Sequence, residues 1–208
     1  MSNPELFVPK EKPFYYSRIS FDVDGVLAKL VDAMIVWVNQ HYGTEYRLED
    51  CSGWGFLEKM LKRDFGLTDE EADQMWANPE VVLAGEPYPG SAEVLQDLMR
   101  RGTEVFFCTA RSPKVREATL EWFAKYYPFV ERKQIYIRTT RPPGGTSFKK
   151  AAIQSLGVDL HVEDSAELAN SLNGTKVLLI DRPWNQGTEV LLRRKSWEEI
   201  QRFIVSGE

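Results

Sequence analysis

Cysteine and histidine are scarce in this sequence, with two of each among 208 residues. Cys51 and Cys108 are too few for a disulfide framework, and neither lies in a spacing typical of a metal site. We therefore expect neither disulfide bonds nor a zinc centre. The low cysteine content favours a reduced, cytoplasmic setting.

Long apolar runs and an excess of positive charge are also missing. No segment approaches the roughly 18 apolar residues of a membrane span, and residues 1–12 lack the charged start and apolar centre of a secretion signal. The net charge is −5, so the overall field does not favour a polyanion such as duplex nucleic acid. We expect a protein that binds neither membranes nor duplex nucleic acid, whereas a small anionic substrate would need only local positive charge.

The hydrophobic content, 43% with 12% aromatic residues, is that of an ordinary globular protein. β-rich segments alternate with segments whose apolar residues recur every three to four positions, which is the spacing of one helix face. This alternation predicts an α/β fold, a three-layer, Rossmann-like parallel sheet with helices on both faces. The expected strands are residues 17–23, 103–108, 134–137, 160–162 and 176–180.

A mostly helical segment of about 55 residues follows the first expected strand, and a Pro/Gly turn at residues 87–90 and a further helix, residues 91–101, lead from it to the second strand. Gly43 is placed to end its first helix, Thr68 and Glu71 have the form of a capping box that begins a later one, and Asn78-Pro79 is expected to end that helix. We therefore predict a small helical cap, residues 29–85, inserted into a core made of residues 1–28 and 86–208. Prolines among charged residues predict an irregular arm over residues 1–16.

The first expected strand ends in two aspartates and a glycine. Side chains two positions apart on an extended chain point to the same side, so Asp22 and Asp24 can face one reacting group, and Gly25 lets the chain turn away. Such a pair suits phosphoryl transfer, in which one carboxylate attacks phosphorus and the other carries a proton. Taken alone, Asp-x-Asp-Gly is more typical of an ordinary acidic turn.

Further polar residues follow the second and fourth expected strands. Thr109 and Arg111 lie just beyond the second strand, and Glu163 and Asp164 end the fourth. Ligands of open parallel sheets bind beyond the carboxyl ends of the strands. The coincidence of these strand ends predicts one site.

Four pieces of the chain resemble, in order, the four motifs of the haloacid dehalogenase superfamily of aspartyl-phosphate enzymes. They are Phe21-Asp-Val-Asp-Gly25, Phe107-Cys-Thr-Ala-Arg111, Lys149-Lys150 and Val162-Glu-Asp-Ser165. The resemblance implies that Asp22 is the nucleophile and Asp24 the acid and base, an acid that the phosphatases and phosphomutases of the superfamily have and the dehalogenases lack. It also implies that Thr109 binds the transferring phosphoryl group and that Lys149, or alternatively Lys150, neutralises it.

The same resemblance implies Mg²⁺ as cofactor. The ion would be held by the Asp22 carboxylate, the Asp24 main-chain carbonyl and Asp164, with Glu163 acting through water. This set agrees with the preference of Mg²⁺ for one or two carboxylates plus water and phosphate oxygens, and acids that converge without a cation would repel one another. We interpret His161 as a core histidine of its strand and His41 as a residue of a cap helix, neither of them a metal ligand.

Within the superfamily the chain is most similar to the 5′(3′)-deoxyribonucleotidases and their bacterial and phage relatives. The similarity rests on three stretches, residues 83–90, 179–185 and 196–199. The chain departs from the animal enzymes of that family at two places: Glu163-Asp164 stands where they have paired aspartates, and Thr109-Ala-Arg111 stands where they have Thr-Ser-Pro. The similarity implies a small phosphorylated substrate, a nucleoside monophosphate. The expected substrate-binding residues are Ala110, Arg111, Lys150, Trp54, Phe56 and Trp76.

Several alternatives stay open at the level of the sequence. The cap aromatic residues can stack on a nucleobase or pack the core of the cap, and Arg111 can meet the substrate or lie in solvent. A sugar-phosphate or phosphoglycolate-type phosphatase or a phosphomutase would use the same core. A non-catalytic binding module would be favoured by loss of a catalytic acid, and none is lost. A homodimer is the commonest state of a small enzyme of this kind.

Overall fold

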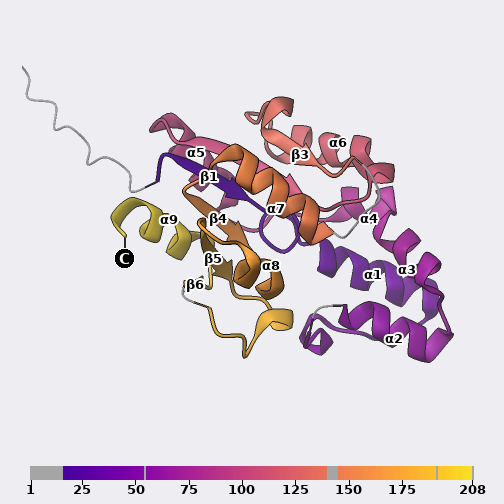
Figure 1. Cartoon of the computed structure of the whole chain (residues 1–208). Helices are drawn as coiled ribbons and strands as arrows, with labels where there is room; N and C mark the ends of the chain where they lie inside the picture. The colour runs from indigo at the N-terminus through magenta and orange to yellow at the C-terminus, as the bar shows by residue number, and fades with distance from the viewer. Residues whose placement is uncertain (1–15, 54, 140–144, 191, 208) are drawn as a thin grey trace, which may run out of the picture.

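The computed structural model describes residues 16–53, 55–139, 145–190 and 192–207. These residues form a six-stranded sheet of order β3-β2-β1-β4-β5-β6, in which every neighbouring pair is parallel (Figure 1). The predicted parallel α/β sheet is confirmed. Its strands are β1 (Arg18–Phe21), β2 (Glu104–Thr109), β3 (Ile135–Ile137), β4 (Leu160–Glu163), β5 (Lys176–Ile180) and β6 (Arg193–Arg194).

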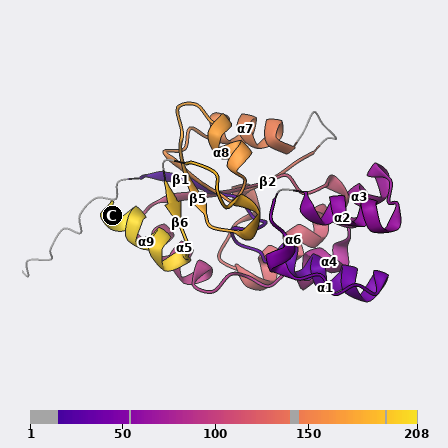
Figure 2. The same cartoon turned by 90° about the horizontal axis from the view of Figure 1, so that it is seen from below.

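Helices cover both faces of this sheet, which gives the predicted three layers (Figure 2). One face carries α7 (Gly145–Leu156) and α8 (Ala166–Ser171). The other face carries α5 (Ser91–Arg100), α6 (Arg116–Tyr126) and α9 (Trp197–Ser206). The short α8 and β6 were not predicted from the sequence, because each is too short to show a periodic pattern.

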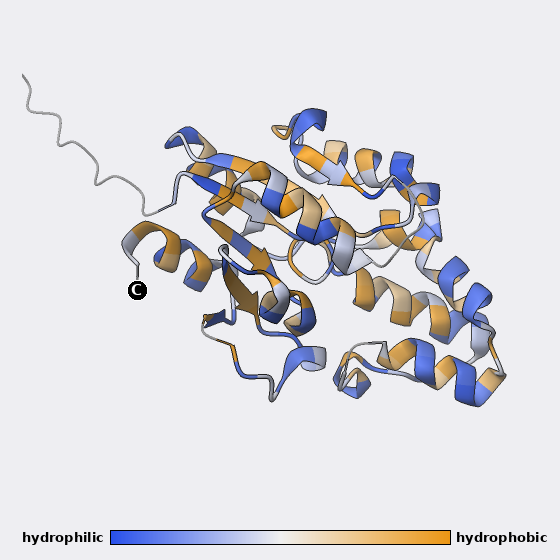
Figure 3. Cartoon of the chain, in the orientation of Figure 1, coloured by the Kyte–Doolittle hydropathy of each residue, from blue (hydrophilic) through white to orange (hydrophobic). Residues whose placement is uncertain are grey.

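The two faces of the central strands differ in chemistry because side chains alternate along a strand. Ile19 and Phe21 of β1 are fully buried in the large apolar cluster that includes α5, α6 and α9. Ser20 of β1 and His161 of β4 point to the opposite face and are also fully buried. Figure 3 shows that most strands are apolar, whereas the helices alternate between apolar and hydrophilic residues. The α7 side of the sheet is therefore where buried polar groups gather.

Four α-helices lie in the described part of residues 29–85. They are α1 (Leu30–Tyr42), α2 (Phe56–Phe65), α3 (Asp69–Trp76) and α4 (Pro79–Ala84), and they share an apolar cluster. Gly43 ends α1 in the left-handed conformation, and Thr68 caps α3, since its Oγ1 accepts the Glu71 N–H at 3.2 Å. α3 ends at Trp76, just before Asn78-Pro79, as predicted. Asn78 also caps the next helix, α4, which was not predicted, since its side chain accepts the Glu80 N–H at 2.9 Å. The division into a cap of residues 29–85 and a core stays a prediction.

The start of β1 is tied to the start of β4 by Asp159. Its Oδ2 accepts the Ser17 N–H and O–H, both at 2.9 Å, and the Arg18 N–H at 3.0 Å. Burial opposes the charge, but these hydrogen bonds outweigh it and hold the pKa of Asp159 below its ordinary value. Of the predicted arm, only Tyr16 is among the described residues. Among all the residues that the structure describes, no helix is both long enough and apolar enough to cross a bilayer.

Candidate active site

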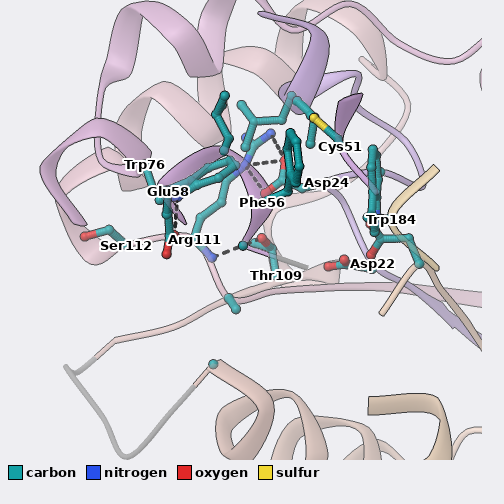
Figure 4. A pocket seen from close by; sticks show the side chains of 18 of the residues that line it. Asp22, Asp24, Cys51, Phe56, Glu58, Trp76, Thr109, Arg111, Ser112 and Trp184 are labelled. Atoms are coloured by element: carbon teal, nitrogen blue, oxygen red, sulfur yellow. Dashed lines mark hydrogen bonds and ion pairs between the residues drawn. The ribbon is translucent and has the colours of Figure 1, made fainter. Parts of the chain in front are cut away.

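The carboxyl ends of β1, β2 and β4 meet at one edge of the sheet, next to the helices of residues 29–85. β1 pairs with both other strands, so the residues after Phe21, Thr109 and Glu163 converge. They line a cavity of about 390 Å³ that also reaches Phe56 and Trp76 (Figure 4). β1 ends at Phe21, two residues earlier than predicted, so Asp22 and Asp24 lie in the loop beyond it.

Asp22 and Lys149 form a buried ion pair at the floor of the cavity. Lys149 lies on α7, and its Nζ is 2.7 Å from Oδ2 of Asp22 and 3.1 Å from Oε2 of Glu163. Burial opposes the ammonium charge, but Asp22, Glu163 and Asp164 outweigh it and raise the pKa of Lys149 above its ordinary value. Lys149 is therefore charged. Lys150, the alternative, is half-buried and is not among the residues that line the cavity.

Three buried acids form a cluster of the kind that holds a metal ion. One carboxylate oxygen each of Asp22, Glu163 and Asp164 lies within 4.8 Å of the others. Burial and the neighbouring Glu163 raise the pKa of Asp22 to about 8 and also raise the pKa of Asp164. Oδ1 of Asp22 and Oδ1 of Asp164 are buried without a hydrogen-bond partner among the described residues. Two buried, unpartnered carboxylate oxygens in one acidic cluster are costly unless a cation compensates them, so the residues fit a hard divalent metal.

Glu163 is occupied by the protein itself. Its carboxylate accepts from Lys149 at 3.1 and 3.2 Å, from the N–H groups of Asp164 and Ser165 at 3.1 and 3.0 Å, and from His161 Nε2 at 3.0 Å. Burial alone would raise the pKa of Glu163, but Lys149 and His161 outweigh it and lower the pKa below its ordinary value. Glu163 is thus a carboxylate whose main partners are protein donors.

His161 is the core histidine of β4 that the sequence predicted, and it has a role that the sequence analysis missed. Its Nε2 faces the Glu163 carboxylate, which can only accept, so Nε2 carries a hydrogen. Its Nδ1 lies 2.8 Å from Oγ of Ser20, the residue opposite it on β1. A buried chain of contacts therefore runs from Ser20 through His161, Glu163 and Lys149 to Asp22. The available signal was the alternation along β1 and β4, which places the side chains of Ser20, His161 and Glu163 on one face.

Asp164 is held by residues that follow β5. The Trp184 indole N–H donates to Asp164 Oδ2 at 2.8 Å, and the Asn185 amide donates to the Asp164 main-chain oxygen at 2.8 Å. Gly25, with φ +75°, lies directly against this carboxylate, since a Cβ there would be 2.1 Å from Asp164 Oδ2. Trp184 and Asn185 were not predicted as site residues, although both belong to the stretch 179–185 that carries the family resemblance.

Arg111 is buried, so the interpretation of it as a solvated arginine is wrong. The side chain is 5% exposed. Its Nε lies 3.0 Å from each Asp24 oxygen and its Nη2 2.6 Å from Oδ1, while the guanidinium lies over the Trp122 ring and donates to Thr119 at 3.3 Å. The forked ion pair fixes the direction of the Asp24 side chain at the cavity wall.

The remaining predicted residues divide between the core wall and the helical wall of the cavity. Thr109 is buried, its Oγ1 accepts the Arg111 N–H at 3.2 Å, and Ala110 lines the cavity beside it. Phe56 and Trp76 are half-buried on the opposite wall, where the Trp76 indole N–H donates to Glu58 at 2.5 Å. At these positions the two rings can either stack on a ligand or pack within the helices, and the structure is compatible with both. Trp54 lies outside the described residues.

His41 and Arg138 were not predicted as site residues, and only Arg138 is among the residues that line the cavity. His41 is exposed and stacks on Trp37, with ring centroids 4.6 Å apart, away from the cavity. Arg138 lines the cavity, and its Nε is buried without a hydrogen-bond partner among the described residues. The site therefore has a further cation, besides Lys149 and Arg111, among the residues that line the cavity.

Comparison with known proteins gives consistent matches over nearly the whole chain. The model of the family described as 5′ nucleotidase, deoxy (Pyrimidine), cytosolic type C protein matches residues 17–208. The chain is 25% identical over 189 residues to a 5′(3′)-deoxyribonucleotidase of Bacillus subtilis (strain 168), covering 90% of this chain and 98% of that protein.

Solved structures of phosphate-binding proteins share the fold. A HAD family hydrolase from Deinococcus radiodurans R1, with bound phosphate and sodium, superposes with TM-score 0.63 at 17% identity, covering 90% of this chain and 94% of that one. CbbY from Rhodobacter sphaeroides, in complex with xylulose-(1,5)bisphosphate, gives TM-score 0.58 at 17% identity, with 88% and 96% covered. These likenesses show the fold, and the family match covers the site. The chain therefore shares the fold of haloacid dehalogenase-like hydrolases, and it belongs to the 5′ nucleotidase, deoxy (pyrimidine), cytosolic type C family, a family of phosphatases.

Proposed function

We propose that this phosphatase is a magnesium-dependent phosphomonoesterase that hydrolyses nucleoside monophosphates through a phosphorylated Asp22. The observation that carries the proposal is the pair of buried, unpartnered Oδ1 atoms on Asp22 and Asp164, next to the Lys149 ammonium. Asp22, Asp164 and the Asp24 main-chain carbonyl would hold the ion. Bound Mg²⁺ would supply positive charge beside the transferring phosphoryl group.

The two carboxylates of the first motif divide the chemistry. In the first step an oxygen of Asp22 attacks phosphorus, the bond from phosphorus to the ester oxygen breaks, and Asp24 donates a proton to the leaving alcohol. In the second step Asp24 takes a proton from water, the water oxygen attacks phosphorus, and inorganic phosphate leaves with the Asp22 carboxylate restored. Arg111 keeps Asp24 at the wall of the cavity that Asp22 also lines.

The phosphoryl group would be bound by donors and cations from the core. The Thr109 hydroxyl and the Lys149 ammonium lie at the floor of the cavity, and Arg138 lines the same cavity with its Nε buried and unpartnered among the described residues. Lys149 is favoured over Lys150 because only Lys149 is in contact with Asp22. Glu163 acts on this group indirectly, since its carboxylate fixes the position of the Lys149 ammonium.

The leaving group would lie against Phe56 and Trp76, whose rings offer flat apolar surfaces to a nucleobase. The name of the Bacillus subtilis relative, a 5′(3′)-deoxyribonucleotidase, supports a nucleotide substrate. A cytoplasmic location and a homodimer stay predictions from the sequence.

The test is phosphate release from deoxy- and ribonucleoside monophosphates, sugar phosphates and phosphoglycolate, with Mg²⁺ and with EDTA. Asp22→Asn keeps the shape of the nucleophile without its charge and should lower turnover on the order of 10³-fold or more. Asp97→Asn, on α5 outside the cavity, is the matched control and should keep wild-type turnover.

Three outcomes would contradict parts of the proposal. Wild-type turnover by a clean preparation of Asp22→Asn contradicts the mechanism. Turnover of sugar phosphates or phosphoglycolate alone leaves the mechanism and removes the nucleotide. No turnover of any ester by the wild-type protein points to a non-catalytic binding module.

A further inference from the structure

The two oxygens of the Asp164 carboxylate have different surroundings. Oδ2 accepts the Trp184 indole N–H at 2.8 Å, whereas Oδ1 is buried without a partner among the described residues. Asp164 is 2% exposed and Trp184 8%, so water does not replace this hydrogen bond at low cost. The protein therefore commits one oxygen of Asp164 to itself and leaves the other without a partner among the described residues, in a carboxylate that belongs to the same acidic cluster as Asp22.

This arrangement is fixed from three sides. Asn185 donates to the main-chain oxygens of Asp164 and Ile180, both at 2.8 Å, which joins the ends of β4 and β5. Gly25 lies so close to Oδ2 and to the Trp184 ring that no side chain fits between them. Rotation of the Asp164 carboxylate would break the indole hydrogen bond without offering another donor. Figure 4 shows Trp184 beside Asp22 at one edge of the cavity.

Asn185 is itself held in place by the neighbouring edge of the sheet. Its Oδ1 accepts from Arg193 Nη1 at 3.0 Å and from the Arg182 N–H at 3.1 Å. Arg193 belongs to β6, and Arg182 also donates to the Gly25 carbonyl at 2.5 Å. The Trp184 indole thus sits on a turn that is tied to β6 on one side and to the Asp22 loop on the other.

We propose that Trp184 is a positioning residue for the metal: its indole N–H occupies Oδ2 of Asp164 so that Oδ1 alone faces the ion. The inference rests on the metal of the proposed function. A carboxylate held in one orientation loses no rotational freedom on binding, and it binds Mg²⁺ through one oxygen, which leaves room for water and phosphate oxygens. Without the indole donor, Asp164 is free to turn, and metal affinity falls.

The experiment measures metal binding directly on the EDTA-treated, desalted protein, without substrate. Mn²⁺ is titrated and the free ion is followed by electron paramagnetic resonance. Trp184→Phe keeps the ring but loses the donor, and we expect about tenfold weaker Mn²⁺ binding, the lower end of the usual effect for residues that orient a metal ligand. Trp184→His restores a ring N–H and should recover part of the affinity, which a purely structural role would not.

Two further variants separate the inference from the proposed function. Trp76→Phe also removes an indole-to-carboxylate hydrogen bond at the cavity wall, but one made to Glu58, and should bind Mn²⁺ like the wild type. Asp164→Asn should abolish binding. If Asp164→Asn loses Mn²⁺ while Trp184→Phe binds it like the wild type, the inference is wrong and the metal site stands. If Asp164→Asn still binds, the metal site of the proposed function is wrong as well.

A measurement on the wild-type protein covers the case in which Trp184→Phe does not fold. With ¹⁵N-labelled tryptophan, Mg²⁺ should shift the indole N–H signal of Trp184 and leave that of Trp76 in place. If saturating Mg²⁺ moves no indole signal, the inference is overturned.

Discussion

Gly25 is the position where one added methyl group should have the largest effect on the site. It has φ +75°, and a Cβ there would lie 2.1 Å from Oδ2 and 2.6 Å from Cγ of Asp164, and 3.0 Å from Cζ2 of Trp184. Both neighbours are buried and hydrogen-bonded to each other. Gly25→Ala therefore forces the Asp164 carboxylate to move.

The expected cost has two parts that can be measured separately. The left-handed backbone disfavours an L-residue by about 1–2 kcal/mol, and forcing a methyl group into a packed site typically costs about 1–3 kcal/mol more. At about 2–4 °C per kcal/mol for a chain of this size, Gly25→Ala should lower the melting temperature by roughly 4–20 °C. Mn²⁺ binding should be lost, because Asp164 no longer holds its orientation.

Gly43→Ala is the control for the backbone part alone. Gly43 ends α1 with φ +67°, and a Cβ there would meet nothing within 4 Å. This variant should lose only roughly 2–8 °C and keep its metal affinity. Thermal unfolding by circular dichroism with and without Mn²⁺ compares the two variants. Equal destabilisation of both, with metal binding intact in both, would refute the contact between Gly25 and Asp164.

Three further predictions concern positions outside the catalytic groups. The folded pKa of Asp159 lies below the unfolded value, so its hydrogen bonds stabilise the protein at neutral pH, and this stability is lost as the pH falls below about 4. Asp159→Asn should therefore make the melting temperature less dependent on pH in that range. A pH profile like that of the wild type would contradict the assignment. Thr68→Ala should cost about 1 kcal/mol in urea unfolding, with Thr68→Ser close to wild type; an equal loss in both would rule out the cap. Burial raises the pKa of the Cys108 thiol to about 12, so iodoacetamide at pH 8 should modify it only after denaturation, as followed by mass spectrometry, and rapid labelling of the native protein would show that the thiol is accessible.

The sequence predicted those features whose signals are local. β5 was expected at residues 176–180 and occupies Lys176–Ile180, because a continuous apolar run between turns defines it. The Thr68 cap depends on residues three apart, and Gly43 on the end of one periodic segment. The convergence of the strand ends also followed from the sequence, since a parallel sheet brings all carboxyl ends to one edge.

The partners of the site residues could not be predicted, because each pair depends on strand order and register. Ser20 and His161 are 141 positions apart and meet only because β1 pairs with β4. Arg111 and Asp24 are 87 positions apart, and nothing near Arg111 in the sequence distinguishes a buried arginine from a solvated one. Trp184 reaches Asp164 from the turn after β5, which lies beside β4 only in the folded sheet.

These long-range pairs explain why the site fits a divalent cation. Arg111 compensates Asp24, and Lys149 compensates Glu163, whose pKa is lowered. Asp22 and Asp164 are left as the two carboxylates without a full counter-charge, and they are the two acids of the buried cluster whose pKa values are raised. They also carry the two unpartnered oxygens. A cation of charge +2 bound to those oxygens would balance the remaining charge on Asp22 and Asp164.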